Sequence, residues 1–81
     1  MEYDELLQFV SDRNEALLSL DEEKIRDFSR KYNIPLSSNP LVFWASVHKC
    51  RLEVTSFSEE VKEESRIWLI SHNFKPEFGP Y

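Results

Sequence analysis

Glycine and cysteine are nearly absent from this chain of 81 residues, which contains only Gly79 and Cys50. Tight hairpin turns between strands usually need Gly or an Asn-Gly pair, so the scarcity of glycine disfavours a β-fold. One thiol cannot form an internal disulfide, which excludes the disulfide scaffolds of small secreted domains. The sequence also lacks an apolar run of membrane-spanning length and a basic signal-peptide region at its start. We therefore expect a soluble protein of a reducing cytoplasm.

The net charge of −5 is distributed unevenly along the chain. Residues 1–23 hold eight acids and one base (−7), residues 24–52 hold six bases and one acid (+5), and residues 53–81 hold six acids and three bases (−3). This polarisation suggests contact with a charged partner. The alternative interpretation is that acids near helix starts and bases near helix ends complement the helix dipoles.

The spacing of apolar residues follows the helical period throughout, which predicts an all-α fold. A chain of this length barely builds one core, but two Trp, six Phe and three Tyr supply large side chains for packing. We predict a single helical domain over residues 1–81, built as a small bundle of three to four helices with an extended C-terminal tail. The expected helices cover about residues 3–18, 22–32, 40–53 and 57–72.

Local chemistry predicts where several of these helices begin and end. Asp21 is suited to cap the second helix, and Asn39 followed by Pro40 is suited to start the third. Asn33 and Asn73 can each take the left-handed position that ends a helix.

Two boundaries stay open at this point. The fourth helix begins either at Ser56, which has capping-box spacing to Glu59, or at Ser58. The first helix either breaks near residues 11–12 or continues to about Leu18, and continuity is favoured.

Residues 39–52 are apolar nearly all round in their first half and basic in their second half. A helix without a polar face must be enclosed by its own domain or by a partner. Within it Trp44, His48 and Arg51 share one face, with Lys49 beside them. An aromatic platform beside cationic donors suits a phosphate-bearing ligand, so we predict these four residues as partner- or ligand-binding contacts, provided that they are exposed. The alternative is that Trp44 is core packing and that His48 and Arg51 pair with acids of neighbouring helices.

The sequence offers no recognisable catalytic or metal-binding set. Cys50 with His48 or His72 is the best nucleophile–base combination, but His48 and Cys50 are two residues apart on a helix and point in different directions. A structural zinc site needs four Cys or His ligands, and the chain has one Cys and two His. We therefore expect no enzymatic activity, no metal and no cofactor.

The second and third helices, joined through Asn33, resemble a helix-turn-helix in outline. The connector over residues 33–39 is longer than the usual turn, however, and apolar residues 41–44 would stand where polar base-reading side chains are expected. The overall acidity would also repel phosphates. A nucleic-acid partner is therefore disfavoured.

One stretch resembles a known group of proteins. Phe43-Trp44-Ala45-Ser46-Val47-His48-Lys49, preceded by Asn39-Pro40 and followed by Ser65-Arg66-Ile67-Trp68-Leu69, is similar to a pattern in small uncharacterised proteins of tailed bacteriophages and prophages. The resemblance covers about residues 25–74 and brings no catalytic residues with it. It implies an accessory protein that acts in an infected bacterial cytoplasm by binding a host factor, including factors of defence systems.

These observations lead to three functional hypotheses. The first is a non-enzymatic acidic binding protein, encoded by a phage, that inhibits or modulates a host macromolecule. The others are a sponge that sequesters a nucleotide-like anionic signal and a helix-turn-helix regulator. We also expect self-association into a homodimer through the third or fourth helix, and no contact with a membrane.

Overall fold

The computed structural model describes residues 2–76, which form four α-helices and no strand. These are α1 (Tyr3–Ser19), α2 (Glu22–Tyr32), α3 (Pro40–Glu53) and α4 (Glu59–Ser71). The predicted all-α class is confirmed, and α1 is continuous as expected. The predicted tail lies outside the described residues. Within the described part of the chain, no helix is both long enough and apolar enough to cross a bilayer.

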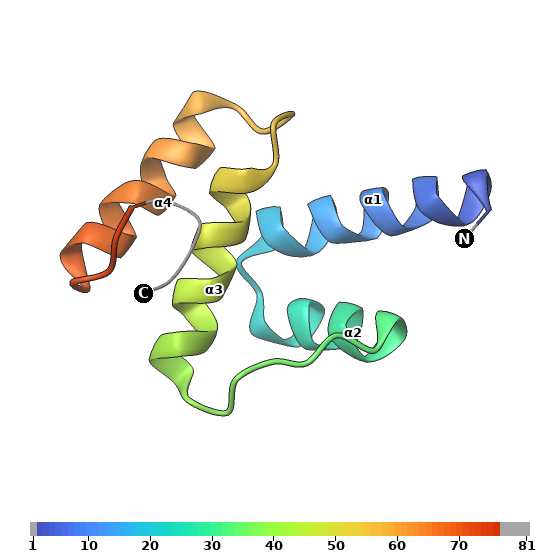
Figure 1. The fold of residues 1–81 in the computed structure, drawn as a ribbon, viewed down its shortest axis with the longest axis horizontal. Helices are drawn as coiled ribbons and strands as arrows, with labels where there is room; N and C mark the ends of the chain where they lie inside the picture. Colours follow the sequence, from blue (N-terminus) through green and yellow to red (C-terminus); the bar gives the residue numbers. More distant parts are fainter. Residues whose placement is uncertain (1, 77–81) are drawn as a thin grey trace. The chain divides into compact units, whose positions relative to one another are not determined.

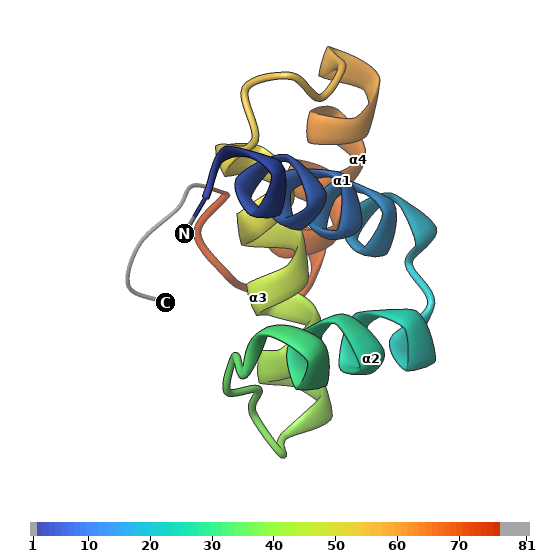
Figure 2. The ribbon, with the colours of Figure 1, turned by 90° about the vertical axis from the view of Figure 1, so that its right-hand side faces the viewer.

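The helices pack in two pairs. α1 packs on α2 in unit 1 (Met1–Leu36), and α3 packs on α4 in unit 2 (Ser37–Tyr81). Figure 1 shows both pairs, and Figure 2 shows α1 and α2 side by side from a second direction. Each unit is compact, and the single domain over residues 1–81 stays a prediction.

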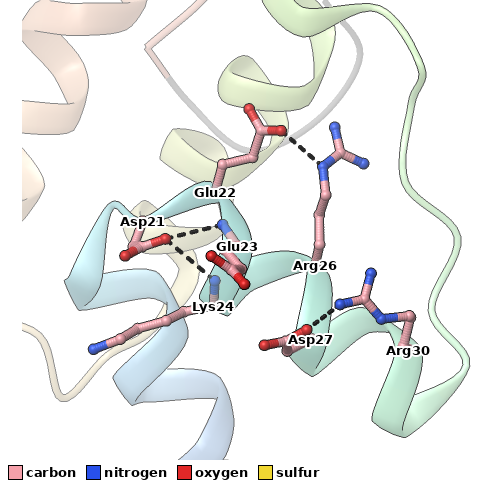
Figure 3. A network of polar contacts seen from close by, with 7 residues as sticks. All are labelled: Asp21, Glu22, Glu23, Lys24, Arg26, Asp27 and Arg30. Atoms are coloured by element: carbon pink, nitrogen blue, oxygen red, sulfur yellow. Dashed lines mark hydrogen bonds and ion pairs between the residues drawn. The ribbon is translucent and has the colours of Figure 1, made fainter.

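The helix starts confirm the capping chemistry predicted for α2 and α3. The Asp21 carboxylate accepts a hydrogen bond from the backbone N–H of Glu23 at 2.9 Å (Figure 3). The Asn39 side chain accepts from the backbone N–H of Leu41, also at 2.9 Å, and Pro40 occupies the first turn. These bonds satisfy N–H groups that have no partner within the helix itself.

Asn33 and Asn73 adopt the left-handed conformation expected of them, with φ of 58° and 65°. After Asn73, the backbone N–H of Phe74 donates to the carbonyl of Leu69 at 2.8 Å. This six-to-one bond is the signature of a Schellman ending, in which Phe74 folds back on the last turn of α4.

The structure decides the boundary that was open at the start of α4. Ser58, rather than Ser56, is the N-cap, because its hydroxyl accepts from the backbone N–H of Val61 at 3.3 Å. Leu69 is completely buried on the inner face of this helix, whereas Ile67 is exposed.

α1 ends in a way that the sequence did not predict. Leu20, which follows the helix, has a left-handed backbone with φ of 51°. Leucine has no side-chain hydrogen bond to offset the clash of its Cβ in this region, which costs roughly 1–2 kcal/mol. A glycine would adopt this conformation without strain, but the residue at this position is leucine.

We expect Leu20→Gly to raise the free energy of unfolding of unit 1 by on the order of 1 kcal/mol. The matched control is Leu18→Gly, because Leu18 is also an exposed leucine near the same helix end but lies inside the helix. The control should lower stability by roughly 1 kcal/mol, the usual helix cost of glycine. Native-state hydrogen exchange of the α2 amides measures the stability of both variants. A loss of stability in the Leu20→Gly variant would contradict the backbone strain assigned to Leu20.

Each unit has its own apolar interior. In unit 1, Phe9 of α1 meets Tyr32 of α2 edge-on with ring centroids 4.9 Å apart, and Phe28 lies beside both. In unit 2, Phe43 and Leu69 are the largest fully buried apolar side chains. Aromatic pairs of this geometry add about 0.5–1.5 kcal/mol beyond the area that they bury.

Candidate functional site

The four predicted contact residues of α3 are largely buried. His48, Lys49 and Arg51 are only 4%, 3% and 2% exposed, and Trp44 is half-buried with its ring edge-on to Phe43 at 5.0 Å. His48, Lys49 and Arg51 therefore do not meet the condition of exposure on which their prediction as contacts depended. The buried side chains of α3 therefore do not form the candidate interaction surface.

His48 is held between α3 and α4. Its Nδ1 lies 3.0 Å from the hydroxyl of Ser65, which is itself fully buried, and its ring stacks on Trp68 with centroids 4.6 Å apart. Trp68 also stacks on His72, at 4.0 Å. Burial, with the nearby Arg51 charge as a second cause, lowers the pKa of His48 to about 4. The ring is therefore neutral at physiological pH. Its contacts with Ser65 and Trp68 join α3 to α4.

The His48–Ser65 pair has the spacing of a base beside a nucleophile, but it is closed to a substrate. Ser65 is 0% exposed, and an attacking hydroxyl has to reach the reacting atom. Among residues 2–76, no group of three or more His, Cys, Asp or Glu side chains is placed to hold a metal ion. The pair is best explained as a packing element of unit 2.

Arg51 is a buried cation with one partner at the surface. Its Nη1 lies 3.2 Å from the carboxylate of Glu64, which is mostly exposed. Within the described residues, Nε and Nη1 of Arg51 have no hydrogen-bond acceptor in good geometry. This arrangement agrees with the alternative in which Arg51 pairs with an acid of a neighbouring helix.

Three of the four basic side chains of α2 are paired with nearby acids. Figure 3 shows the Arg26 guanidinium on the Glu22 carboxylate, at 2.9 Å, and Arg30 on Asp27 one turn away. Lys31 reaches across to Asp12 of α1 at 2.8 Å. Charges that are already paired contribute little to attracting a phosphate, so Arg26, Arg30 and Lys31 offer little to an anionic ligand.

A cavity of about 250 Å³ lies between α1 and α2 in unit 1. It is lined by Asp12, Glu15, Ala16, Lys24, Asp27, Phe28 and Lys31. Three acids and two lysines give this lining a net charge of −1, and Lys31 is already bound to Asp12. The cavity therefore offers no concentrated charge to a small ligand.

Asp12 anchors α2 on α1. Its carboxylate accepts hydrogen bonds from Lys31, Tyr32 and Gln8 at 2.8, 2.6 and 2.8 Å. The bond from Lys31, followed by those from Tyr32 and Gln8, lowers the pKa of Asp12 to about 2. This anchor fixes the last turn of α2 level with the third turn of α1.

A stripe of exposed apolar residues in unit 1 lies N-terminal to that anchor. Tyr3, Leu6 and Leu7 are 73%, 48% and 51% exposed, and with half-buried Val10 they follow the spacing i, i+3, i+4, i+7 along one face of α1. We call these four residues the α1 surface. Isolated exposed leucines are ordinary, but a contiguous stripe on one helix face is typical of an interaction site.

The lengths of the two helices explain why this stripe is uncovered. α1 has 17 residues and α2 has 11. The difference of six residues corresponds to about 9 Å of helix. Because Tyr32 at the end of α2 contacts Phe9 and Asp12, the first turns of α1 project beyond α2 (Figure 1).

The α1 surface lies in a strongly acidic segment. Glu2, Asp4 and Glu5 are all exposed, and the first base along the chain is Arg13. Acids at a helix start complement the dipole, which accounts for the positions of Asp4 and Glu5 but not for the exposed leucines between the acids and Phe9.

Comparison of the chain with known protein families, with curated proteins and with solved structures finds no match. The candidate site therefore depends on the geometry alone.

Proposed function

We propose that this chain is a non-enzymatic binding protein, encoded by a phage, that acts in the bacterial cytoplasm. It engages a host protein through the α1 surface and inhibits or modulates that protein, for which a defence factor is one candidate class. The observation that carries the proposal is the exposed stripe of Tyr3, Leu6 and Leu7, which α2 is too short to cover. The resemblance of residues 25–74 to small phage proteins supports the origin, and the genes that flank the coding sequence test it.

The two other functional hypotheses have less support from the geometry. A nucleotide sponge and a DNA-binding regulator both need accessible cations, but Lys49 and Arg51 are buried and the arginines of α2 face acids. A helix-turn-helix also packs its two helices as one body, whereas α2 and α3 belong to different compact units. Self-association through α3 or α4 stays a prediction.

Site-directed cross-linking in bacteria tests the proposed function. A photo-reactive phenylalanine analogue in place of Tyr3 should cross-link the full-length chain to a protein partner, whereas the same analogue at Leu18 should not. The captured protein is then purified and titrated with the chain. We expect the double variant Leu6→Ser/Leu7→Ser to weaken binding at least about tenfold, or about 1.4 kcal/mol.

Leu18→Ser is the matched control, because Leu18 and Leu6 are both 48% exposed on the same helix. It should change the affinity by less than about twofold. Equal effects of the control and the double variant would contradict binding through the α1 surface.

A further inference from the structure

We infer that the α1 surface is a docking site for a cationic amphipathic helix of the partner protein. This inference rests on the proposed function and specifies the chemistry of the partner. Its evidence is the combination of an exposed apolar stripe, an acidic surround and an uncapped helix start on the same two turns of α1.

The charge around the apolar stripe indicates which class of partner it can bind. Residues 2–11 carry Glu2, Asp4 and Glu5 and no base. A second copy would bring the same acids against them, and like charges across an interface are costly. Anionic lipid headgroups and nucleic-acid phosphates would be repelled in the same way. A cationic protein surface is the class whose charge complements this segment.

The shape of the stripe favours a helix as the docking element. Tyr3, Leu6, Leu7 and Val10 occupy about two turns, or roughly 10 Å, of one helix face. Such a ridge packs into the grooves of another helix that carries apolar side chains at i, i+3, i+4 and i+7. At 100° per residue, Asp4 lies on one edge of the stripe, and Glu2 precedes its first residue as the N-cap. Basic residues of the incoming helix can pair with both acids.

The start of α1 is poorly stabilised without such a partner. Glu2 occupies the N-cap position but makes no side-chain capping hydrogen bond. The first turns also project beyond the end of α2, and short helical segments without tertiary contacts are marginal in water. Docking would supply these contacts, so binding should protect the amides of residues 6–10 from hydrogen exchange, because the first helical hydrogen bond is that of the Leu6 N–H.

A designed peptide provides the test against the full-length chain. The probe is a labelled helical peptide of about 18 residues, long enough to hold a helix, with Leu at i, i+3, i+4 and i+7 and Lys at the polar positions. One comparison peptide replaces every Lys with Glu, and another shuffles the Lys peptide so that the stripe is lost. By fluorescence anisotropy, we expect the Lys peptide to bind at least about tenfold more tightly than either comparison peptide. Added salt should weaken that binding.

Variants of the chain assign the binding to the α1 surface. Leu6→Ser/Leu7→Ser should weaken binding of the Lys peptide about tenfold or more, and Leu18→Ser should leave it nearly unchanged. Equal binding of the Glu peptide, equal binding of the shuffled peptide, or equal effects of the two variants would each overturn the inference. Circular dichroism checks that the variants keep their helices, as expected for exposed positions.

Failure of this inference can be separated from failure of the proposed function. The variant Glu2→Gln/Asp4→Asn/Glu5→Gln removes the acids and keeps the stripe. One outcome is that the partner captured by cross-linking binds this variant with unchanged affinity but binds Leu6→Ser/Leu7→Ser more weakly. In that case the partner binds the α1 surface, and the inference of a cationic helix is rejected. If that partner binds both variants unchanged, the proposed function falls as well.

Discussion

Replacing Phe43 with alanine is expected to lower the free energy of unfolding of unit 2 by about 3–5 kcal/mol. Phe43 is 1% exposed and is the largest of the completely buried side chains. Its removal loses the transfer free energy of the ring and leaves a cavity between packed helices. Since a small domain holds only about 5–15 kcal/mol in total, the variant should be close to unfolding at room temperature.

Both tryptophans, Trp44 and Trp68, lie in unit 2, so tryptophan fluorescence during urea denaturation reports on that unit. The matched control is Leu41→Ala, because Leu41 is an apolar residue of the same helix that is 46% exposed. It should shift stability by less than about 1 kcal/mol. If the two variants were equally destabilised, the assigned core of unit 2 would be incorrect.

Acidification is expected to destabilise unit 2 through His48. The pKa of this residue falls from an ordinary value of 6.5 to about 4, chiefly because the ring is buried. Between these values the unfolded chain binds a proton that the folded chain excludes. The free energy of unfolding of unit 2 is therefore highest above about pH 6.5 and decreases as the pH falls. By about pH 4 it is lower by on the order of 3 kcal/mol.

His48→Gln removes the titrating ring and keeps a polar group within reach of Ser65, so most of this pH dependence should disappear. His72→Gln is the control, because His72 is exposed and should retain the dependence. Urea midpoints measured by tryptophan fluorescence at pH 7.5, 6, 5 and 4 make the comparison. An unchanged pH slope in the His48 variant would show that another group is responsible.

The local endings of the helices could be predicted from the sequence because they depend on residues a few positions apart. Asp21 and Asn39 at helix starts and Asn33 and Asn73 at helix ends all behave as expected. Leu20 is the exception, since no intrinsic preference of leucine favours the left-handed region. There the geometry of the short α1–α2 connection overrides propensity.

The burial of Lys49 and Arg51 could not be predicted from spacing. In an amphipathic helix the buried face lies opposite the polar face, so the sequence shows which side is buried. The first half of α3 is apolar nearly all round and gives no such indication. Residues 40–53 are helical, so Trp44, His48 and Arg51 share one face of α3. The spacing did not indicate that α4 would cover His48 with Ser65 and Trp68.

The α1 surface was present in the sequence as an apolar stripe, but its exposure depends on a neighbour. A stripe of this kind normally packs against the next helix, and here that helix ends at Tyr32, level with Phe9. The predicted ranges of about 3–18 and 22–32 already differ in length. Comparing the lengths of consecutive helices would therefore have pointed to the uncovered turns.

The most direct test of the central claim is a nuclear magnetic resonance titration of the isotope-labelled full-length chain with the Lys peptide. Binding through the α1 surface predicts that the largest amide shifts fall on residues 3–10 and that amide exchange slows at residues 6–10. Shifts confined to α3 and α4, with residues 3–10 unchanged, would contradict it.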